Sequence, residues 1–412
     1  MRFSLFIIGI FYFIFGFVTW LNSVLIPYLK IACQLESNLQ AYLVAFAFYI
    51  SYFVMALPSA WLLQKTGFKN GMAWGLIVMA LGALIFIPAA QTRLYNLFLL
   101  GLFVQGTGLA ILQTAANPYV AVLGKPESAA QRISIMGIAN KVAGIISPIV
   151  LGAIVFAQSE DIESNLQKLD AIQKNAFLQD LAAKVILPYG IMAVVLLALA
   201  LMLRFTPLPN VDKDLVEENK AESAKKSIWQ YPQLVLGVIA LFLYVGVEVI
   251  AGDTIIQYGI SWGIDKSEAK FFTSLTLTAM LIGYVVAIFT IPRYISQEKM
   301  LVICSLLGLI FSTMILLSKG FVSVLGVALL GLANSVMWPA IFPLAIADLG
   351  RHTKTGSAML IMAIAGGALL PLLYGYLADI PQIGFRYAYF VLLPAYLFIA
   401  FYGAFWAKKR NW

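Results

Sequence analysis

Long apolar stretches alternate with short polar ones along the whole of this 412-residue chain. Each apolar stretch is close to or longer than the ~20 residues that a helix needs to cross about 30 Å of hydrocarbon. There are twelve such stretches, so the pattern predicts an all-α membrane protein with twelve transmembrane helices. The predicted spans lie near residues 4–28, 39–64, 72–91, 95–123, 133–157, 185–205, 232–260, 269–292, 299–318, 321–348, 357–378 and 387–407.

The first apolar stretch could be taken for a signal peptide, because Arg2 precedes it. It is too long for one, keeps aromatic and polar residues through Trp20 and Asn22, and lacks a cleavage site made of small residues. We therefore expect this stretch to be a retained helix.

Two long polar segments interrupt the apolar pattern. Residues 206–230 divide the predicted helices six and six, and their charged composition is typical of a solvated linker. We therefore predict an N-terminal six-helix bundle over 1–205, a linker over 206–230 and a C-terminal six-helix bundle over 231–412. The second segment, about 158–184, is expected to carry a short amphipathic helix.

A repeated motif relates the two halves. The pattern GxxxPxxxG occurs in the fifth predicted helix and again 223 residues later in the eleventh, and the tripeptide Gly-Leu-Ala recurs at the same offset in the fourth and tenth. The residues of the first motif are Gly144, Pro148 and Gly152, and those of the second are Gly367, Pro371 and Gly375. Such glycines and prolines also serve close packing and helix bending. Two matches at one offset predict two pseudo-symmetric bundles, the arrangement of the major facilitator fold.

Composition and charge agree with a membrane location. The chain is 62% hydrophobic and 11% charged, with a net charge of +8. Lys and Arg are more frequent in the loops on the side that would carry both termini, which predicts that the termini and the 206–230 linker are cytoplasmic. The net charge reflects this bias, so we expect no nucleic-acid partner.

The inventory of cysteine and histidine is small. Cys33 and Cys304 are far apart in the sequence, and His352 is the single histidine. Neither a disulfide framework nor a metal site of histidine and cysteine can be built from these residues. The sequence also lacks a Walker motif or another nucleotide cradle, so we expect no metal, no cofactor and no direct use of ATP.

Three ionisable residues lie well inside apolar stretches: Lys141, Glu248 and Asp253. An ionised group at bilayer depth costs at least ~2.5 kcal/mol, so such residues usually face a polar cavity and serve transport. We expect them to take part in ion coupling, with Glu248 as the principal carboxylate and Lys141 paired with either acid. A purely structural ion pair is the alternative.

Amides and tryptophans add a second set of polar positions at membrane depth. Gln113 and Asn117 share one helix face, and amides offer the donors and acceptors that sugar hydroxyls require. A tryptophan ring beside an amide is a common platform for a sugar. The predicted binding residues are Trp20, Asn22, Gln113, Asn117, Asn140, Asn334 and Trp338. The alternatives to sugar binding for these residues are hydrogen bonding between helices, packing or a position at the membrane interface.

Five segments resemble the fucose:proton symporter family of the major facilitator superfamily, particularly its glucose/galactose and N-acetylglucosamine transporter branches. They are WLNSVLIPYLK (20–30), LQTAANPYVAVLG (112–124), ESAAQRISIMGIANKVAG (127–144), YVGVEVIAGD (244–253) and NSVMWPAIFPLAI (334–346). The resemblance implies a sugar transporter of a bacterial inner membrane. Where the fucose branch has acidic residues implicated in proton coupling, this chain has Ser23 and Gln113. A coupling cation must therefore use Glu248, Asp253 or Lys141.

The expected function is import of a hexose, either glucose/galactose or N-acetylglucosamine, by alternating access and in symport with a proton or a sodium ion. The expected partners are a small sugar and membrane lipid, and the expected active form is a monomer. A sugar uniporter is the first alternative. A membrane-bound enzyme that modifies sugar or lipid is less favoured, because an enzyme of this kind would leave the paired halves unexplained. A sugar receptor that has kept the fold is a further alternative.

Overall fold

The computed structural model describes residues 2–122, 129–155, 169–205, 227–291, 293–349 and 352–407, and every regular element in these ranges is a helix. Within them, 12 helical segments are long and apolar enough to cross a membrane. The predicted number of spans is therefore confirmed. Residues 206–226 of the predicted linker lie outside the described part, and the proposed bundle boundaries remain predictions.

The first half of the chain contains the helices of spans one to six. α1 and α2 together form the first span, α3 forms the second and third, and α7 continues into α8. Their bounds are α1 (Arg2–Trp20), α2 (Asn22–Ala32), α3 (Asn38–Thr92), α4 (Tyr95–Val122), α5 (Ala129–Val155), α7 (Ala171–Ala183) and α8 (Ile186–Phe205).

The second half contains more interrupted helices. They are η4 (Ile228–Gln230), α9 (Pro232–Asp253), α10 (Ile255–Ser261), α11 (Lys266–Ala269), α12 (Phe272–Thr290), α13 (Gln297–Leu317), α14 (Gly320–Asn334), α15 (Met337–Ile346), α16 (Thr353–Met362), η6 (Ala363–Ala365), α17 (Gly366–Asp379), α18 (Gly384–Ala388), η7 (Tyr389–Val391), α19 (Leu392–Phe401) and η8 (Tyr402–Trp406).

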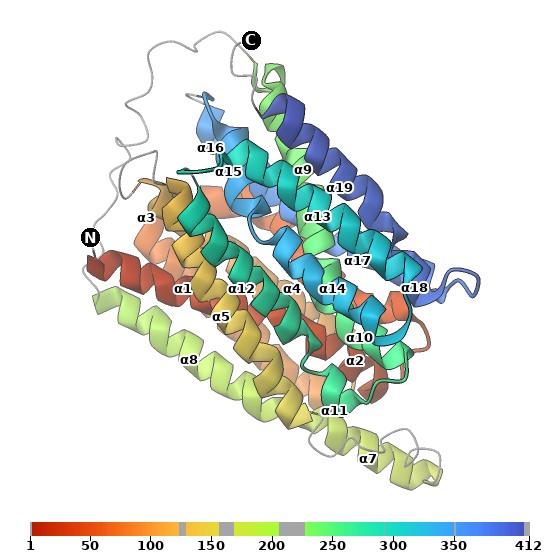
Figure 1. Cartoon of the computed structure of the whole chain (residues 1–412). Coiled ribbons are helices and arrows are strands. Elements are labelled where there is room, and N and C mark those ends of the chain that lie inside the picture. Colours follow the sequence, from red (N-terminus) through yellow and green to blue (C-terminus); the bar gives the residue numbers. More distant parts are fainter. Residues whose placement is uncertain are drawn as a thin grey trace.

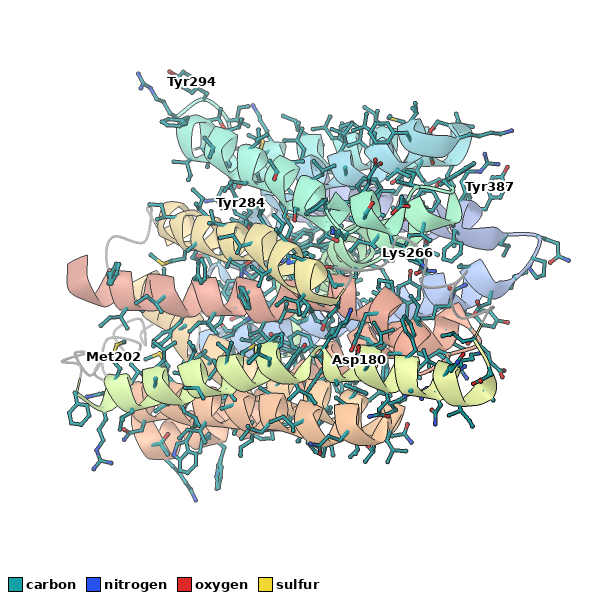
Figure 2. The ribbon with its side chains drawn as sticks, turned by 90° about the horizontal axis from the view of Figure 1, so that it is seen from below. Asp180, Met202, Lys266, Tyr284, Tyr294 and Tyr387 are labelled. Carbon is teal, nitrogen blue, oxygen red and sulfur yellow. The ribbon has the colours of Figure 1, made fainter. Side chains whose placement is uncertain are left out.

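The long helices run roughly side by side, and the beginning of α1 and the end of α19 lie at the same end of the assembly (Figure 1). We call this the terminal end, and the opposite end, which carries α10, α11 and α18, the far end. Figure 2 shows the same division, with Met202 and Tyr294 at the terminal end and Lys266 and Tyr387 at the far end. Odd-numbered spans therefore run from the terminal end to the far end.

The outer surface is apolar over much of its area. Large side chains such as Phe205, Leu317 and Phe289 are at least 72% exposed on the outward faces of their helices. A continuous surface of this kind would associate in water, whereas hydrocarbon solvates it.

Several helix breaks differ from the prediction. The loop between spans two and three is shorter than expected, because the two helical parts of α3, Asn38–Leu63 and Lys65–Thr92, meet in a tight turn at Gly67, whose backbone is not helical (φ 77° and ψ 166°). A positive φ is strained for other residues, which explains glycine at this kink. The span predicted over 232–260 as one helix is divided at Thr254 into α9 and α10.

Two further segments refine the prediction. The span predicted over 321–348 is divided into α14 and α15, which are separated by Ser335 and Val336. The helix expected within 158–184 is confirmed as α7, which begins with a capping box of Asp170 and Gln173 and continues into the sixth span.

The repeated glycine motifs occupy corresponding places in the two halves. A Cβ atom on Gly152 of α5 would lie 3.4 Å from Lys270 in the second half, and one on Gly375 of α17 would overlap the ring of Tyr42 of α3 in the first half. Both motifs therefore face the opposite half of the chain, as the pseudo-symmetry of the major facilitator fold requires. The small residues allow α5 and α17 to approach that half closely.

Candidate functional site

A cavity of about 120 Å³ lies where helices of the two halves meet. Six residues predicted from the sequence line it: Trp20, Gln113, Asn140, Lys141, Glu248 and Trp338. They come from α1, α4, α5, α9 and α15, so the wall combines both halves of the chain. The tertiary structure thus brings together residues that are up to 318 positions apart in sequence, the separation of Trp20 and Trp338.

The cavity extends from the middle of the bundle toward the terminal end. On α1 it is lined from Tyr12 to Trp20, and on α9 from Tyr244 to Val249. Both helices run toward the far end, and residues beyond Trp20 and Val249 are not in the wall. The cavity therefore stops at the level of Trp20.

Lys141 and Glu248 form an ion pair across the cavity wall. Nζ of Lys141 donates to Oε1 of Glu248 over 2.7 Å, and their side chains are 7% and 13% exposed. The sequence left the partner of Lys141 open between two acids, and the structure pairs it with Glu248. Because one residue comes from each half, the pair joins the halves, and removal of either partner would leave a buried charge.

Trp20 closes the cavity toward the far end. Its indole ring is 3% exposed and lies 4.8 Å from Nζ of Lys141, measured to the ring centroid, which is a cation–π geometry. The same ring packs directly on Gly252 of α9, so closely that a Cβ atom at this position would overlap it. Trp20 is therefore fixed by contacts with both α5 and α9.

Gln113 contacts a tyrosine that the sequence analysis did not select. Its Nε2 donates to the hydroxyl of Tyr52 over 3.1 Å, and both side chains line the cavity. Asn140, on α5, is partly exposed to the same space. Together these groups present amide and phenol atoms to a solute in the cavity.

Tyrosines form much of the remaining wall. Besides Tyr52, they are Tyr12, Tyr49, Tyr244 and Tyr284. Figure 2 shows Tyr284 on α12 near α5, and a Cβ on Gly137 would lie 3.0 Å from its ring. The residues predicted from the sequence are amides, tryptophans and charged residues and do not include these phenols. The segment Tyr49-Ile-Ser-Tyr52, with two tyrosines at a spacing of three on one helix face, was the available signal.

Three predicted site residues are buried but do not line the cavity: Asn22, Asn334 and Asp253. Oδ1 of Asn334 accepts a hydrogen bond of 2.8 Å from the hydroxyl of Tyr396, which joins α14 to α19 inside the second half. The structure thus gives Asn334 an interhelical contact, the alternative considered for such amides. The side chain of Asn117 lies outside the described part of the structure.

The far end is joined by a carboxylate at a helix N-terminus. Asp379, the last residue of α17, accepts hydrogen bonds from the backbone N–H groups of Asn38 and Leu39, each over 2.8 Å, and from Nδ2 of Asn38 over 2.7 Å. A carboxylate at the N-terminus of a helix satisfies unpaired N–H groups and the positive end of the helix dipole. Nζ of Lys30 donates a hydrogen bond of 2.6 Å to Oδ1 of Asn38. This contact closes the far end between the two halves.

No group of three or more potential metal-binding side chains occurs among the described residues. Cys33 and Cys304 are free, and each is separate from the cavity wall. The chemistry of the site is thus hydrogen bonding, aromatic contact and one ion pair.

Comparisons with known proteins agree with this architecture. A family model described as Major Facilitator Superfamily matches residues 8–262. The chain is 35% identical over 410 residues to the glucose/galactose transporter of Brucella abortus, which covers 99% of this chain and 95% of that protein. It is 30% identical to the L-fucose-proton symporter of Escherichia coli, over 89% of this chain and 85% of that one.

Solved structures extend the comparison to three dimensions. The crystal structure of the transporter FucP in the outward conformation aligns with a TM-score of 0.74 and 28% identity over 98% of both chains. A D-xylose-proton symporter aligns with a TM-score of 0.67 at 15% identity and so shares the fold alone. The family model matches more than half of the chain, and the relatives align over most of its length. The chain therefore belongs to the fucose:proton symporter family of the major facilitator superfamily, whose members are membrane transporters and not enzymes.

Proposed function

We propose that this protein imports a hexose or an N-acetylated amino-hexose across a bacterial inner membrane, in symport with a proton or a sodium ion. The observation that carries the proposal is the cavity between the two halves, lined by tryptophans, tyrosines and amides and crossed by the Lys141–Glu248 pair. Bacterial relatives named as glucose/galactose transporters and fucose-proton symporters support it.

The charge balance of the wall favours a neutral solute. Lys141 and Glu248 are the charged side chains among the described lining residues, and their 2.7 Å contact cancels one charge with the other. An anionic or cationic solute would have to break this pair, which is costly when neither partner is hydrated. Neutral hydroxyl and acetamido groups can instead bond to amides and phenols.

The aromatic part of the wall suits a sugar ring. Trp20 and Trp338 lie on the two halves, and the ring of Trp338 is stacked on Phe342 with centroids 5.8 Å apart. Axial C–H groups of a hexose pack on such faces while its hydroxyls reach Gln113 and Asn140. This arrangement predicts loss of affinity for solutes that lack either the ring or the hydroxyls.

Both termini are proposed to be cytoplasmic, from the distribution of basic residues. The cavity then lies on the cytoplasmic side of Trp20, and the Asp379 contact lies on the outer side. Opening of the outer side would require α17 to leave the N-terminus of α3, which is a movement of one half against the other. The cavity is complete within one chain, so a monomer is proposed as the active form.

Solute counterflow in proteoliposomes tests the proposal. Purified protein is reconstituted with internal unlabelled sugar, and uptake of radiolabelled glucose, galactose, fucose and N-acetylglucosamine is compared with and without imposed proton and sodium gradients. We expect counterflow of at least one hexose and a gradient-driven excess over equilibrium. Counterflow without any gradient effect would identify a uniporter, and sugar binding without counterflow would identify a receptor.

A further inference from the structure

A second buried polar site lies on the far-end side of Trp20. Its centre is Asp253, the last residue of α9, which is 0% exposed and does not line the cavity. Both of its carboxylate oxygens have no hydrogen-bond partner among the described residues. Buried polar groups are nearly always satisfied, and an isolated buried carboxylate is especially unfavourable, so this group needs an explanation.

The groups around Asp253 carry no compensating positive charge. Asp253 interacts electrostatically with Tyr42 and Tyr49 of α3 and with Glu248 of α9. The two tyrosines are neutral and Glu248 is acidic. The nearby hydroxyls of Thr254 and Tyr389 bond to each other over 2.6 Å. Lys141 is paired with Glu248, and no described side chain donates to either carboxylate oxygen of Asp253, so Asp253 has no basic partner among the described residues.

The end of α9 adds negative potential at the same point. α9 stops at Asp253 and α10 starts at Ile255, so the carboxylate stands at a helix C-terminus. The helix dipole is negative at this end and disfavours a second negative charge while it favours a cation. Ends of interrupted helices provide cation sites in other transporters for this reason.

A second oxygen is available beside the carboxylate. The hydroxyl of Tyr42 is buried, and it also has no hydrogen-bond partner in the described structure. The ring of Tyr42 packs against Tyr374, whose ring packs against Tyr389, and the Tyr389 hydroxyl bonds to Thr254, the residue after Asp253. Oxygen atoms without partners from α3 and α9, which belong to opposite halves, therefore lie in one buried region. A carboxylate and a phenol can share a proton or contribute to the oxygen shell of a hard cation.

We propose that Asp253 takes up the coupling cation, a proton or a sodium ion, with the Tyr42 hydroxyl as a further ligand. The inference rests on the proposed function as a coupled transporter and gives the coupling role to Asp253 in place of Glu248, the carboxylate favoured from sequence. Glu248 is already neutralised by Lys141, whereas Asp253 is not neutralised by any described side chain.

The position of this site gives a physical reason for coupling. In the conformation described here, the far end is closed by Asp379 and Asp253 is fully buried. An ionised Asp253 without a cation opposes this burial, so closure is favoured once the cation is bound. Trp20 packs on the preceding residue, Gly252, and lines the cavity, so it connects the cation site with the solute site.

A binding measurement without any sugar tests the cation site directly. The midpoint temperature of unfolding of the purified full-length protein is followed in detergent, first as sodium replaces choline at constant ionic strength, then as the pH is lowered without sodium. A cation at about 100 times its dissociation constant should shift the unfolding equilibrium of the wild type roughly 100-fold toward the folded state. Asp253→Asn should abolish this shift. Asp180→Asn, the same change at an exposed position of α7, should retain it (Figure 2).

The two arms distinguish the ions. Stabilisation by sodium at constant pH identifies a sodium site, and stabilisation by acid that Asp253→Asn lacks identifies a proton site. If neither ion stabilises the wild type more than Asp253→Asn, the inference is overturned, whether or not the protein transports sugar. Failure of the proposed function is a different result, namely no counterflow of any hexose by a protein whose cation response is intact.

Tyr42→Phe provides a second variant in case Asp253→Asn does not fold. It removes one hydroxyl and keeps the ring that packs edge-on against Tyr374. Coupling between two ligands is reciprocal and is typically 5- to 150-fold, so saturating cation should raise the sugar affinity of the wild type by about this factor. Tyr42→Phe should raise the cation concentration needed for half of this effect. An unchanged cation dependence in Tyr42→Phe would exclude the phenol as a ligand, and cation-driven accumulation by Asp253→Asn would overturn the proposal.

Discussion

Nζ of Lys141 and Oε1 of Glu248 are 2.7 Å apart, and the two residues belong to opposite halves of the chain. This single contact neutralises both ionisable groups of the cavity wall and joins α5 to α9. Its formation explains how a lysine is tolerated at membrane depth, where it could not easily extend to the interface.

Lys141→Met should leave Glu248 as an orphaned charge, with a loss of stability of about 3 to 5 kcal/mol and impaired transport. Glu248→Gln should have a similar effect through Lys141. We expect the double variant to recover part of the loss, as measured by thermal unfolding and by counterflow. Lys141→Met combined with Asp253→Asn is the control and should show no recovery. Strictly additive losses in the Lys141–Glu248 double variant would contradict an energetic coupling between the two residues.

Gln113→Ala should weaken sugar binding by roughly 5- to 150-fold, because removal of a buried hydrogen-bonding partner costs about 1 to 3 kcal/mol. Tyr52→Phe removes the hydroxyl that accepts from Gln113 and should have a smaller effect in the same direction. Calorimetric titration with the transported sugar measures both. Asn334→Ala is the matched control, since Asn334 bonds to Tyr396 outside the cavity, and its change should appear in stability and not in affinity. Wild-type affinity in Gln113→Ala would place the sugar elsewhere.

Gly252→Ala should displace the Trp20 ring, because the new Cβ would occupy space that the ring now fills. The cavity and the Asp253 site share this ring contact, so we expect both sugar affinity and the cation response to fall by at least about tenfold. Gly9→Ala tests for a general effect of alanine in a helix, since a Cβ there meets no atom within 4 Å. Equal behaviour of the two variants would show that the Trp20 contact is dispensable.

Asp379→Asn should weaken closure of the far end. The substitution keeps one acceptor oxygen but removes the charge from three hydrogen bonds at the N-terminus of α3. A charge at an exposed helix terminus contributes about 0.3 to 1 kcal/mol. We expect a larger population with an open far end, measured as faster maleimide labelling of a cysteine introduced next to Leu39. The control is Asp265→Asn, which removes an exposed helix-capping carboxylate of α11. Unchanged labelling in Asp379→Asn would contradict the role in closure.

The native Cys33 should interfere little with that labelling. Burial raises the pKa of its thiol to about 11, although Arg93 acts in the opposite direction. The thiolate is the reactive form, so Cys33 should react slowly near pH 7 and faster as the pH approaches its pKa. The pKa is higher in the folded than in the unfolded protein, so this group contributes stability at neutral pH that is lost above the ordinary thiol pKa. Rapid labelling of the wild type at pH 7 would contradict this environment.

Sequence alone determined the number of spans, the membrane location and the repeat between the halves. Hydrocarbon thickness fixes the length of an apolar helix, so each span is visible as a local pattern. The motif around Gly144 and its copy around Gly367 was likewise visible, because close packing against the opposite half requires small residues at fixed positions. The break at Thr254 was not predicted, since interruption of a buried helix depends on contacts with neighbouring helices.

The site was only partly accessible from sequence. Polarity at membrane depth identified Lys141, Glu248 and Gln113, since a polar residue there requires a compensating environment. The same criterion also selected Asn334, which bonds to Tyr396 within one half and does not line the cavity. It did not select Tyr52, because tyrosine is common in apolar segments. A helix exposes different faces to different neighbours, and the face that meets the cavity is set by packing among distant segments.

The partner of each buried charge was decided by tertiary structure alone. Glu248 and Asp253 are five residues apart on the same span and are alike in sequence terms, but Glu248 is paired and Asp253 is not. The distinction arises because Lys141 of α5 reaches Glu248 beside the cavity, while no basic side chain of the described residues reaches Asp253 at the end of α9. Ionic interactions depend on separations of a few ångströms, which sequence spacing does not specify between helices of different halves.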